Sequence, residues 1–321
     1  MIIKPNISII VPVYNVEKTI ERCARSLFEQ SFNDIEYIFV NDCTTDSSIQ
    51  ILKKVLNDFP KRKNQITILD HQLNRGVAAA RNTGLDKARG DYVIQIDSDD
   101  WVEKTMIEEL YNTAVKNNSD FVWSDFYVGF YNDKNKLVYR KQDVPQNPAS
   151  CIKEILTGSF HAGLWNKLMK RDICVANNIR FPEGINICED IVFVISYLLH
   201  ANNIKYVSKA FYHYVQYPDS LTNVKTRQYF ETQFKVVQIL EEILHNNEYN
   251  EYLLIHKAKI KRDVLFSNIF ENQEYLNIYP EAISYMYKNI GILSKSIIRL
   301  ANNKHRLLAK IFISMKSILI M

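Results

Sequence analysis

The sequence is short of glycine, of paired cysteines and of long apolar runs. It has 8 glycines in 321 residues, against an average share of about 7%, which excludes a collagen-like repeat. The five cysteines are odd in number and form no CxxC pair, so a disulfide-built mini-domain is excluded and free thiols in a reducing compartment are expected. Because no run of about 18 apolar residues occurs, we expect no membrane-spanning helix.

The N-terminal residues lack the layout of a signal peptide. Their apolar stretch, Ile7–Val13, is short and contains Pro12, so we expect a cytoplasmic protein. The 40 basic and 36 acidic residues nearly balance, which argues against a nucleic-acid binder. The last acidic residue is Glu281, and seven basic residues follow it. The tail is therefore basic and the body mildly acidic.

The first 125 residues alternate between two periodicities. Apolar runs typical of strands buried on both faces are Ile7–Val11, Ile35–Val40, Ile66–Leu69, Tyr92–Ile96 and Phe121–Ser124. Between them apolar residues recur at helical spacing over Ile20–Phe28, and further helices are predicted, among them Val77–Ala88. The alternation predicts an α/β fold with a mostly parallel sheet flanked by helices. Ligands of such sheets bind beyond the carboxyl ends of the strands.

The rest of the chain divides into two parts. Residues 126–222 are less regular and rich in aromatic side chains, and residues 223–321 have a helical pattern. We expect residues 1–125 and 126–222 to be the two halves of one domain, followed by a C-terminal helical region with a basic amphipathic tail.

Three of the few glycines, Gly76, Gly84 and Gly90, fall in one stretch that also contains Arg81. Arg81 lies near the start of a predicted helix, where a phosphate can meet both its guanidinium and free backbone N–H groups. The alternative is a tight loop that carries a surface arginine.

Carboxylates follow two of the predicted strands. Asp97 and Asp99 point to the same side if the strand end is extended, and they repel unless a cation or water separates them. Oxygen ligands of this kind suit Mg²⁺ or Mn²⁺. A solvated acidic turn is the alternative, but the position at the sheet's carboxyl edge favours a metal. Asp42 ends the second strand and can accept hydrogen bonds from a base or ribose, or only from its own turn.

Four motifs occur in order, each at a strand end or connection. They are Pro12-Val13-Tyr14-Asn15, Asn41-Asp42 with Asp46, Asn74-Arg75-Gly76 with Ala80-Arg81-Asn82-Thr83-Gly84, and Asp97-Ser98-Asp99-Asp100. This set resembles the family 2 glycosyltransferases, which have a nucleotide-sugar-binding fold of the GT-A type. The resemblance implies inverting transfer of a hexosyl or N-acetylhexosaminyl group from a UDP-sugar, with Mn²⁺ or Mg²⁺. Residues 1–125 are then the nucleotide-sugar-binding half and residues 126–222 the acceptor and catalytic half.

The resemblance also implies roles for single residues. The donor-binding set is Pro12, Tyr14, Asn15, Asp42, Arg81, Asp97 and Ser98. Tyr14 and Asp42 hold the base and ribose, Asp97 lies near the ribose or sugar, and Asp99 binds the metal. Cys43 stands where the family usually has glycine, which puts the contacts to the base in doubt.

The acceptor side resembles the same family through Glu189 and Asp190, which precede an apolar helix. Inversion needs a base for the acceptor hydroxyl, and this resemblance implies Asp190 in that role, with Glu189 beside it. Acids at a helix N-terminus are the structural alternative. Trp165 either stacks on a sugar or belongs to the core, and Lys167 lies in the same acceptor segment. His213 is a candidate metal or phosphate contact, at the start of a stretch to Thr222 that resembles a loop closing over the diphosphate.

A narrow polar stripe marks the C-terminal tail. Its members are Arg299, Asn303, Arg306, Lys310, Ser314 and Ser317. Such a helix suits an anionic membrane surface, or else it packs against protein. The expectation is thus an enzyme of bacterial surface-polysaccharide synthesis, peripheral on the inner face of the cell membrane, with a glycan or lipid-linked oligosaccharide as acceptor. The alternative is a catalytically inactive nucleotide-sugar-binding subunit of an assembly complex.

Overall fold

The computed structural model describes residues 4–131, 133–217, 225–245, 247–267, 269–287 and 292–302. It divides into two compact units. The first comprises residues 1–155 and 160–220, and the second comprises residues 156–159 and 221–321. Among the described residues, no helix combines the length and the apolar character needed to cross a membrane.

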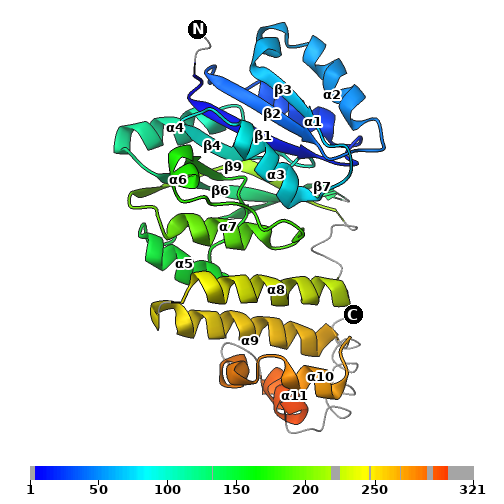
Figure 1. Ribbon diagram of the computed structural model, residues 1–321, viewed down its shortest axis with the longest axis vertical. Helices are drawn as coiled ribbons and strands as arrows, with labels where there is room; N and C mark the ends of the chain where they lie inside the picture. Colours follow the sequence, from blue (N-terminus) through cyan, green and yellow to red (C-terminus); the bar gives the residue numbers. More distant parts are fainter. Residues whose placement is uncertain are drawn as a thin grey trace. The chain divides into compact units, whose positions relative to one another are not determined.

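Strands and helices alternate through the first unit (Figure 1). Its strands are β1 (Ile7–Val13), β2 (Ile35–Asn41), β3 (Ile66–Asp70), β4 (Tyr92–Gln95), β5 (Trp101–Val102), β6 (Phe121–Phe130), β7 (Asp133–Arg140), β8 (Lys167–Lys170) and β9 (Ile204–Gln216). Its helices are α1 (Ile20–Phe28), α2 (Ser48–Asn57), the 3₁₀ helix η1 (Pro60–Gln65), α3 (Val77–Lys87), α4 (Met106–Asn117), α5 (Pro148–Thr157), α6 (Arg171–Ala176) and α7 (Glu189–Leu198). The expected α/β class is confirmed.

Nine strands of the described chain form one mixed sheet in the order β3-β2-β1-β4-β8-β6-β9-β5, with β7 paired to β6. The first four strands in that order are parallel, as the sequence predicts. Beyond β4 the pairing changes, because β8 runs antiparallel to both β4 and β6. The sheet thus has a parallel half, β3-β2-β1-β4, whose strands end at one common carboxyl edge. Strands from the aromatic-rich part of the chain extend it beyond β4.

The two faces of the parallel half are covered by different helices. Ile9 and Val11 of β1 belong to a core that also contains residues of α1, α2 and α4. Ile10 points to the other face, since side chains alternate along a strand. There Gly84 of α3 comes so close that an added Cβ would lie 2.3 Å from the Ile10 Cγ2. Glycine is required at this position because α3 packs directly against the strand.

The second unit is helical. It contains α8 (Arg227–Ile243), the 3₁₀ helices η2 (Asn247–Tyr249) and η3 (Pro280–Tyr287), α9 (Asn250–Ser267), α10 (Asn272–Asn277) and α11 (Ile292–Asn302). Of the predicted basic stripe only Arg299 and the end of α11 are described, and residues 303–321 lie outside the described residues. The proposed membrane surface of the tail stays a prediction.

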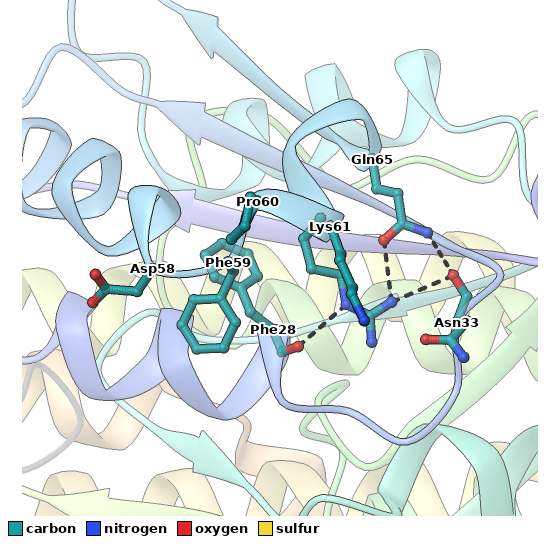
Figure 2. A pocket seen from close by; sticks show the side chains of 8 residues that line it. Phe28, Asn33, Asp58, Phe59, Pro60, Lys61 and Gln65 are labelled. Carbon is teal, nitrogen blue, oxygen red and sulfur yellow. Dashed lines mark hydrogen bonds between the residues drawn. The ribbon is translucent and has the colours of Figure 1, made fainter.

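A pocket of about 460 Å³ lies beside η1, and the buried Arg62 is among its lining residues. Figure 2 shows Phe28, Phe59 and Pro60 on one side of it and Asn33 with Gln65 on the other. The guanidinium of Arg62 donates to the carbonyls of Phe28, Gln30, Phe32 and Asn33, which belong to the end of α1 and the loop after it. The pocket therefore serves the fold, because its arginine fixes the α1–β2 connection.

Replacing Arg62 with methionine is expected to lower the free energy of unfolding by about 2–4 kcal/mol. The variant leaves several buried carbonyls without a donor, and bonds to charged groups contribute about 1.5–3 kcal/mol each. Urea unfolding measures the loss. Lys61→Met is the matched control, because Lys61 is next to Arg62 in the sequence and its side chain is exposed. Equal stability of both variants would contradict this role for Arg62.

Candidate active site

Two loops at the carboxyl edge of the sheet are tied together by Asn15. Its side-chain oxygen accepts from the backbone N–H of Thr45 at 3.1 Å, and its own N–H donates to the Thr44 hydroxyl at 2.7 Å. Asn15 has φ 52°, a left-handed conformation that asparagine tolerates. Tyr14, the neighbouring donor candidate, is 45% exposed. The β1–α1 loop is thus held rigid while Tyr14 remains open to a ligand.

Asp42 anchors a third loop at this edge. Its carboxylate lies 2.7 Å from the Nδ1 of His71 and accepts from the backbone N–H groups of Arg75 and Gly76 at 2.9 and 2.8 Å. A carboxylate has about four acceptor positions, so these three contacts occupy most of them, and the Asp42 side chain is 4% exposed. Cys43 has φ 59°, so this residue adopts the left-handed conformation for which glycine is usual.

The loop anchored by Asp42 sets the start of α3. Gly76 has φ 86°, which favours glycine, and a Cβ there would meet the side chain of Asn186 at 2.2 Å. The other ring nitrogen of His71 lies 2.9 Å from the hydroxyl of Thr83 in α3. The position of the helix, and so of Arg81 on it, follows from these contacts.

Arg81 gathers three carboxylates from distant parts of the chain. Its Nη2 donates to Asp97 at 2.7 Å, and its Nη1 donates to Asp190 at 2.6 Å and to Glu189 at 2.5 Å. The arginine side chain is 4% exposed, and that of Asp190 is 23% exposed. We call Arg81, Asp97, Glu189 and Asp190 the Arg81 cluster. It joins the end of β4 to the N-terminus of α7, whose first residues are Glu189 and Asp190.

The charges of the Arg81 cluster do not balance. One guanidinium faces three carboxylates, and burial together with Glu189 and Asp97 raises the pKa of Asp190 to about 8, while Arg81 and Lys167 oppose the shift. The three carboxylates in turn raise the pKa of Arg81 above its usual value. Asp190 is therefore a stronger base than an ordinary carboxylate, as proton removal from a hydroxyl requires.

The acidic motif forms a turn rather than an extended strand end. β4 ends at Gln95, and the backbone N–H of Asp100 donates to the carbonyl of Asp97 at 3.2 Å. Asp100 points inward, where it accepts from the hydroxyl of Tyr212 and the N–H of Val215, both at 2.7 Å. The sequence-based expectation of an extended end is thus wrong here, because the buried Asp100 closes the turn.

Asp99 fits a divalent cation as one ligand among others. Burial and the neighbouring Asp97 raise the pKa of Asp99 to about 6, and a cation would relieve that repulsion. No group of three or more His, Cys, Asp or Glu side chains within the described ranges is arranged to hold a metal. A Mg²⁺ or Mn²⁺ here would need diphosphate oxygens in addition to Asp99, the usual arrangement for Mg²⁺ with phosphorylated substrates.

Asn82, next to Arg81, secures the segment that leads to α7. Its amide nitrogen donates to the carbonyl of Phe181 and its oxygen accepts from the N–H of Phe181, both at 2.9 Å. The ring of Phe181 stacks on Phe193 of α7 with 4.0 Å between the centroids. The Asn82 contact and the bracing of Asp42 by His71 were not expected from the sequence. Only the Arg81-Asn82-Thr83 motif could have indicated them.

The three acceptor-side candidates lie in packed surroundings. Trp165 is 3% exposed and stacks on Tyr212 at 4.3 Å, so the structure gives it the core position of the two alternatives. Lys167 is fully buried, and its ammonium donates to the carbonyl of Gly163 and the side-chain oxygen of Asn166. His213 stacks on Trp101 at 3.4 Å. None of these three contacts reaches a residue of the Arg81 cluster, and residues 218–224 of the predicted closing loop lie outside the described residues.

Ser98 and Pro12 complete the donor set. Ser98 is buried, and its carbonyl accepts from the hydroxyl of Thr19 at 3.2 Å. Pro12 lies in β1, in register with Val40 of β2. The contacts described for Ser98 and Pro12 therefore involve their backbones and help to fix the loops at the carboxyl edge.

A comparison with known families decides the affiliation. The sequence pattern of the family described as "Glycosyl transferase family 2" matches residues 8–174, which contain β1 to β8 and the acidic turn. The chain belongs to this family. Its fold is of the GT-A type.

Two curated relatives and one solved structure illustrate the similarity. The "Uncharacterized glycosyltransferase EpsJ" of Bacillus subtilis is 35% identical over 227 residues, which cover 68% of this chain and 64% of that protein. The "Minor teichoic acid biosynthesis protein GgaB" of the same species is 30% identical over 315 residues, 90% of this chain and 33% of that protein. The match thus spans less than two thirds of either relative. The crystal structure of Staphylococcus aureus TarS 1–349 in complex with UDP has a TM-score of 0.68 at 21% identity and covers 97% of this chain and 91% of that chain.

Proposed function

We propose that the chain is a metal-dependent, inverting glycosyltransferase that moves a hexosyl or N-acetylhexosaminyl group from a UDP-sugar to a hydroxyl of a glycan. The observation that carries the proposal is the Arg81 cluster, which unites Asp97 after β4 with Asp190 at the start of α7. In a sheet of this kind the carboxyl edge is where a nucleotide binds. UDP in the similar TarS structure supports the choice of nucleotide.

The chemistry assigned to Asp190 is proton transfer. An acceptor hydroxyl gives its proton to the Asp190 carboxylate while its oxygen attacks the anomeric carbon and the bond to the diphosphate breaks. One displacement inverts the configuration at that carbon. Arg81 holds the carboxylate in place, and the low exposure of the Arg81 cluster limits competition from water.

The donor is held by the loops around Tyr14, Asp42 and Asp97 in this proposal. The exposed Tyr14 stacks on the base, and the remaining acceptor position of Asp42 takes a base N–H or a ribose hydroxyl. Asp99 is the ligand for Mn²⁺ or Mg²⁺, which would offset the charge of the leaving diphosphate when bound. Burial and the neighbouring Asp97 raise the pKa of Asp99. A cation bound to Asp99 would relieve this repulsion, which supports Asp99 as the ligand.

The acceptor is proposed to be part of a bacterial cell-surface glycan, with a lipid-linked oligosaccharide as its form at the membrane. The name of GgaB places that relative in teichoic acid biosynthesis, which supports this class of acceptor. The basic tail would bring the enzyme to the inner face of the cell membrane.

A panel of nucleotide sugars, assayed with Mn²⁺ for release of the nucleoside diphosphate, tests the proposed function. At least one UDP-sugar is expected to be turned over faster by the wild-type chain than by Asp190→Asn. Binding of UDP-sugars without any turnover, in the presence of acceptor, would instead support a catalytically inactive binding subunit.

Transfer is expected to rise with pH through about 8. Asp190 must be ionised to accept a proton, and its pKa is raised to about 8, so activity is lost as the pH falls below that value. Glu189 disfavours the ionised form of Asp190, and Glu189→Gln should therefore move the acid limb of kcat/KM to lower pH. Profiles from about pH 6 to 9.5 test this, with Glu21→Gln, an exposed substitution on α1, as the control. An acid limb at the same pH in all three proteins would contradict the link between Glu189 and Asp190.

A further inference from the structure

A second cavity of about 700 Å³ opens in the first unit, at the same edge of the sheet as the Arg81 cluster. The start of α1 and the ends of β6 and β9 line it, together with β5 and β7. Its size is in the range of small-molecule binding sites. Among the described residues, neither the donor-binding set nor the Arg81 cluster lines this cavity, whereas His213, the candidate metal or phosphate contact, does.

The cavity is basic and aromatic. Lys18, Arg22 and Lys136 line it, and among the described residues no aspartate or glutamate does. Within the described part of the chain neither Lys18 nor Lys136 forms an ion pair with a carboxylate, and both side chains are exposed. Trp101 and Tyr131 add ring surfaces of the kind that pack on sugars and polyols. The lining thus suits a ligand that carries both negative charge and hydroxylated carbon.

The cavity adjoins the proposed metal ligand. Arg22 donates to the backbone carbonyl of Asp99 at 2.5 Å, and Tyr217 donates to the same carbonyl at 3.3 Å. Both side chains line the cavity. A ligand in it would therefore lie beside the acidic turn, on the cation-lined side of Asp99.

A buried histidine in the wall is also incompletely satisfied. The ring of His213 is 3% exposed and stacks on Trp101, and its Nε2 lies 2.7 Å from Glu103. Its Nδ1 has no hydrogen-bond partner among the described residues. Such a group is costly in a closed protein interior, and a ligand or the water that accompanies it would satisfy the atom.

We propose that this cavity binds a phosphate-bearing segment of the acceptor glycan. This inference rests on the proposed function, which supplies the transfer reaction. Two lysines without carboxylate partners supply charge for a phosphodiester, and the aromatic rings supply a surface for the neighbouring polyol or sugar. The donor diphosphate is the other source of phosphate. The acceptor is favoured because the donor-binding residues do not line the cavity.

Binding of poly(glycerol phosphate) oligomers, measured by calorimetry with no sugar transfer required, tests the inference. The double variant Lys18→Gln/Lys136→Gln is expected to weaken binding about tenfold, since each exposed ionic contact contributes up to about fivefold. Affinity for UDP and KM for a neutral oligosaccharide acceptor should stay unchanged. The matched control is Lys53→Gln/Lys54→Gln, which removes the same charge from an exposed part of α2.

Two outcomes would overturn the inference. An equal loss of UDP affinity would assign the cavity to the donor. Equal binding of the oligomers by the double variant and the control would leave only non-specific charge attraction. Because binding is measured without turnover, an inactive enzyme that still binds the oligomers through these lysines would refute the proposed function and leave the cavity assignment intact.

Discussion

Asp190→Asn is expected to lower kcat about 10³-fold while the affinity for UDP changes by less than about threefold. Asparagine has nearly the same shape and can still accept the hydrogen bond from Arg81. It cannot take up a proton from the acceptor, and a positioned general base contributes about 10²–10⁴ to the rate. Single-turnover transfer and calorimetric titration with UDP measure the two quantities.

Asp172→Asn is the matched control for this substitution, since its side chain is 71% exposed on α6. It should leave both quantities unchanged. Glu189→Gln tests the neighbouring acid, for which a smaller loss is expected because Glu189 is 7% exposed and less open to an acceptor. A kcat for Asp190→Asn within tenfold of wild type would remove Asp190 from the role of base.

Arg81→Met is expected to be the most destabilising substitution at the site, by about 3–5 kcal/mol. It leaves Asp97, Glu189 and Asp190 close together without the cation that all three contact. Arg81 opposes the rise in the pKa of Asp190, so without it that pKa rises further in the folded state, and the folded protein holds a proton that the unfolded chain releases. Stability therefore falls as the pH rises, and the deficit should be larger at pH 8 than at pH 5.

Urea unfolding of wild type and Arg81→Met at both pH values checks this prediction. Arg81→Lys should recover part of the stability, because a lysine keeps the charge but not the planar fork that reaches separate carboxylates. Arg75→Met is the control, since Arg75 pairs with Glu183 at the surface. A deficit that is small, or independent of pH, would mean that Arg81 does not hold the cluster together.

Local pattern predicted the parallel half of the fold well. The apolar runs at Ile7–Val11 and Ile35–Val40 fall within β1 and β2, and Val77–Ala88 coincides with α3 to within one residue. The two strands are buried on both faces, so their unbroken apolar runs carry the signal. Apart from β6, the strands beyond the parallel half were not predicted. β5, for example, has two residues, too few for a period of its own, and its Trp101 lies opposite His213 of β9, which is remote in the sequence.

At the site, too, single residues could be predicted from local sequence but contacts between remote residues could not. Arg81, Asp97 and Asp190 were each predictable as functional residues, and the structure brings them together. Their mutual contacts were not predictable, because Arg81 and Asp190 are 109 residues apart in sequence. The inward turn of Asp100 depends on Tyr212, a residue of a strand that the sequence did not indicate.

The stereochemistry of the product tests the central claim most directly. Incubation with an α-linked UDP-sugar and acceptor, followed by NMR of the anomeric proton, reports whether one displacement took place. The account predicts a β-linked product, since an acceptor oxygen activated by Asp190 attacks opposite the departing diphosphate. An α-linked product would contradict it.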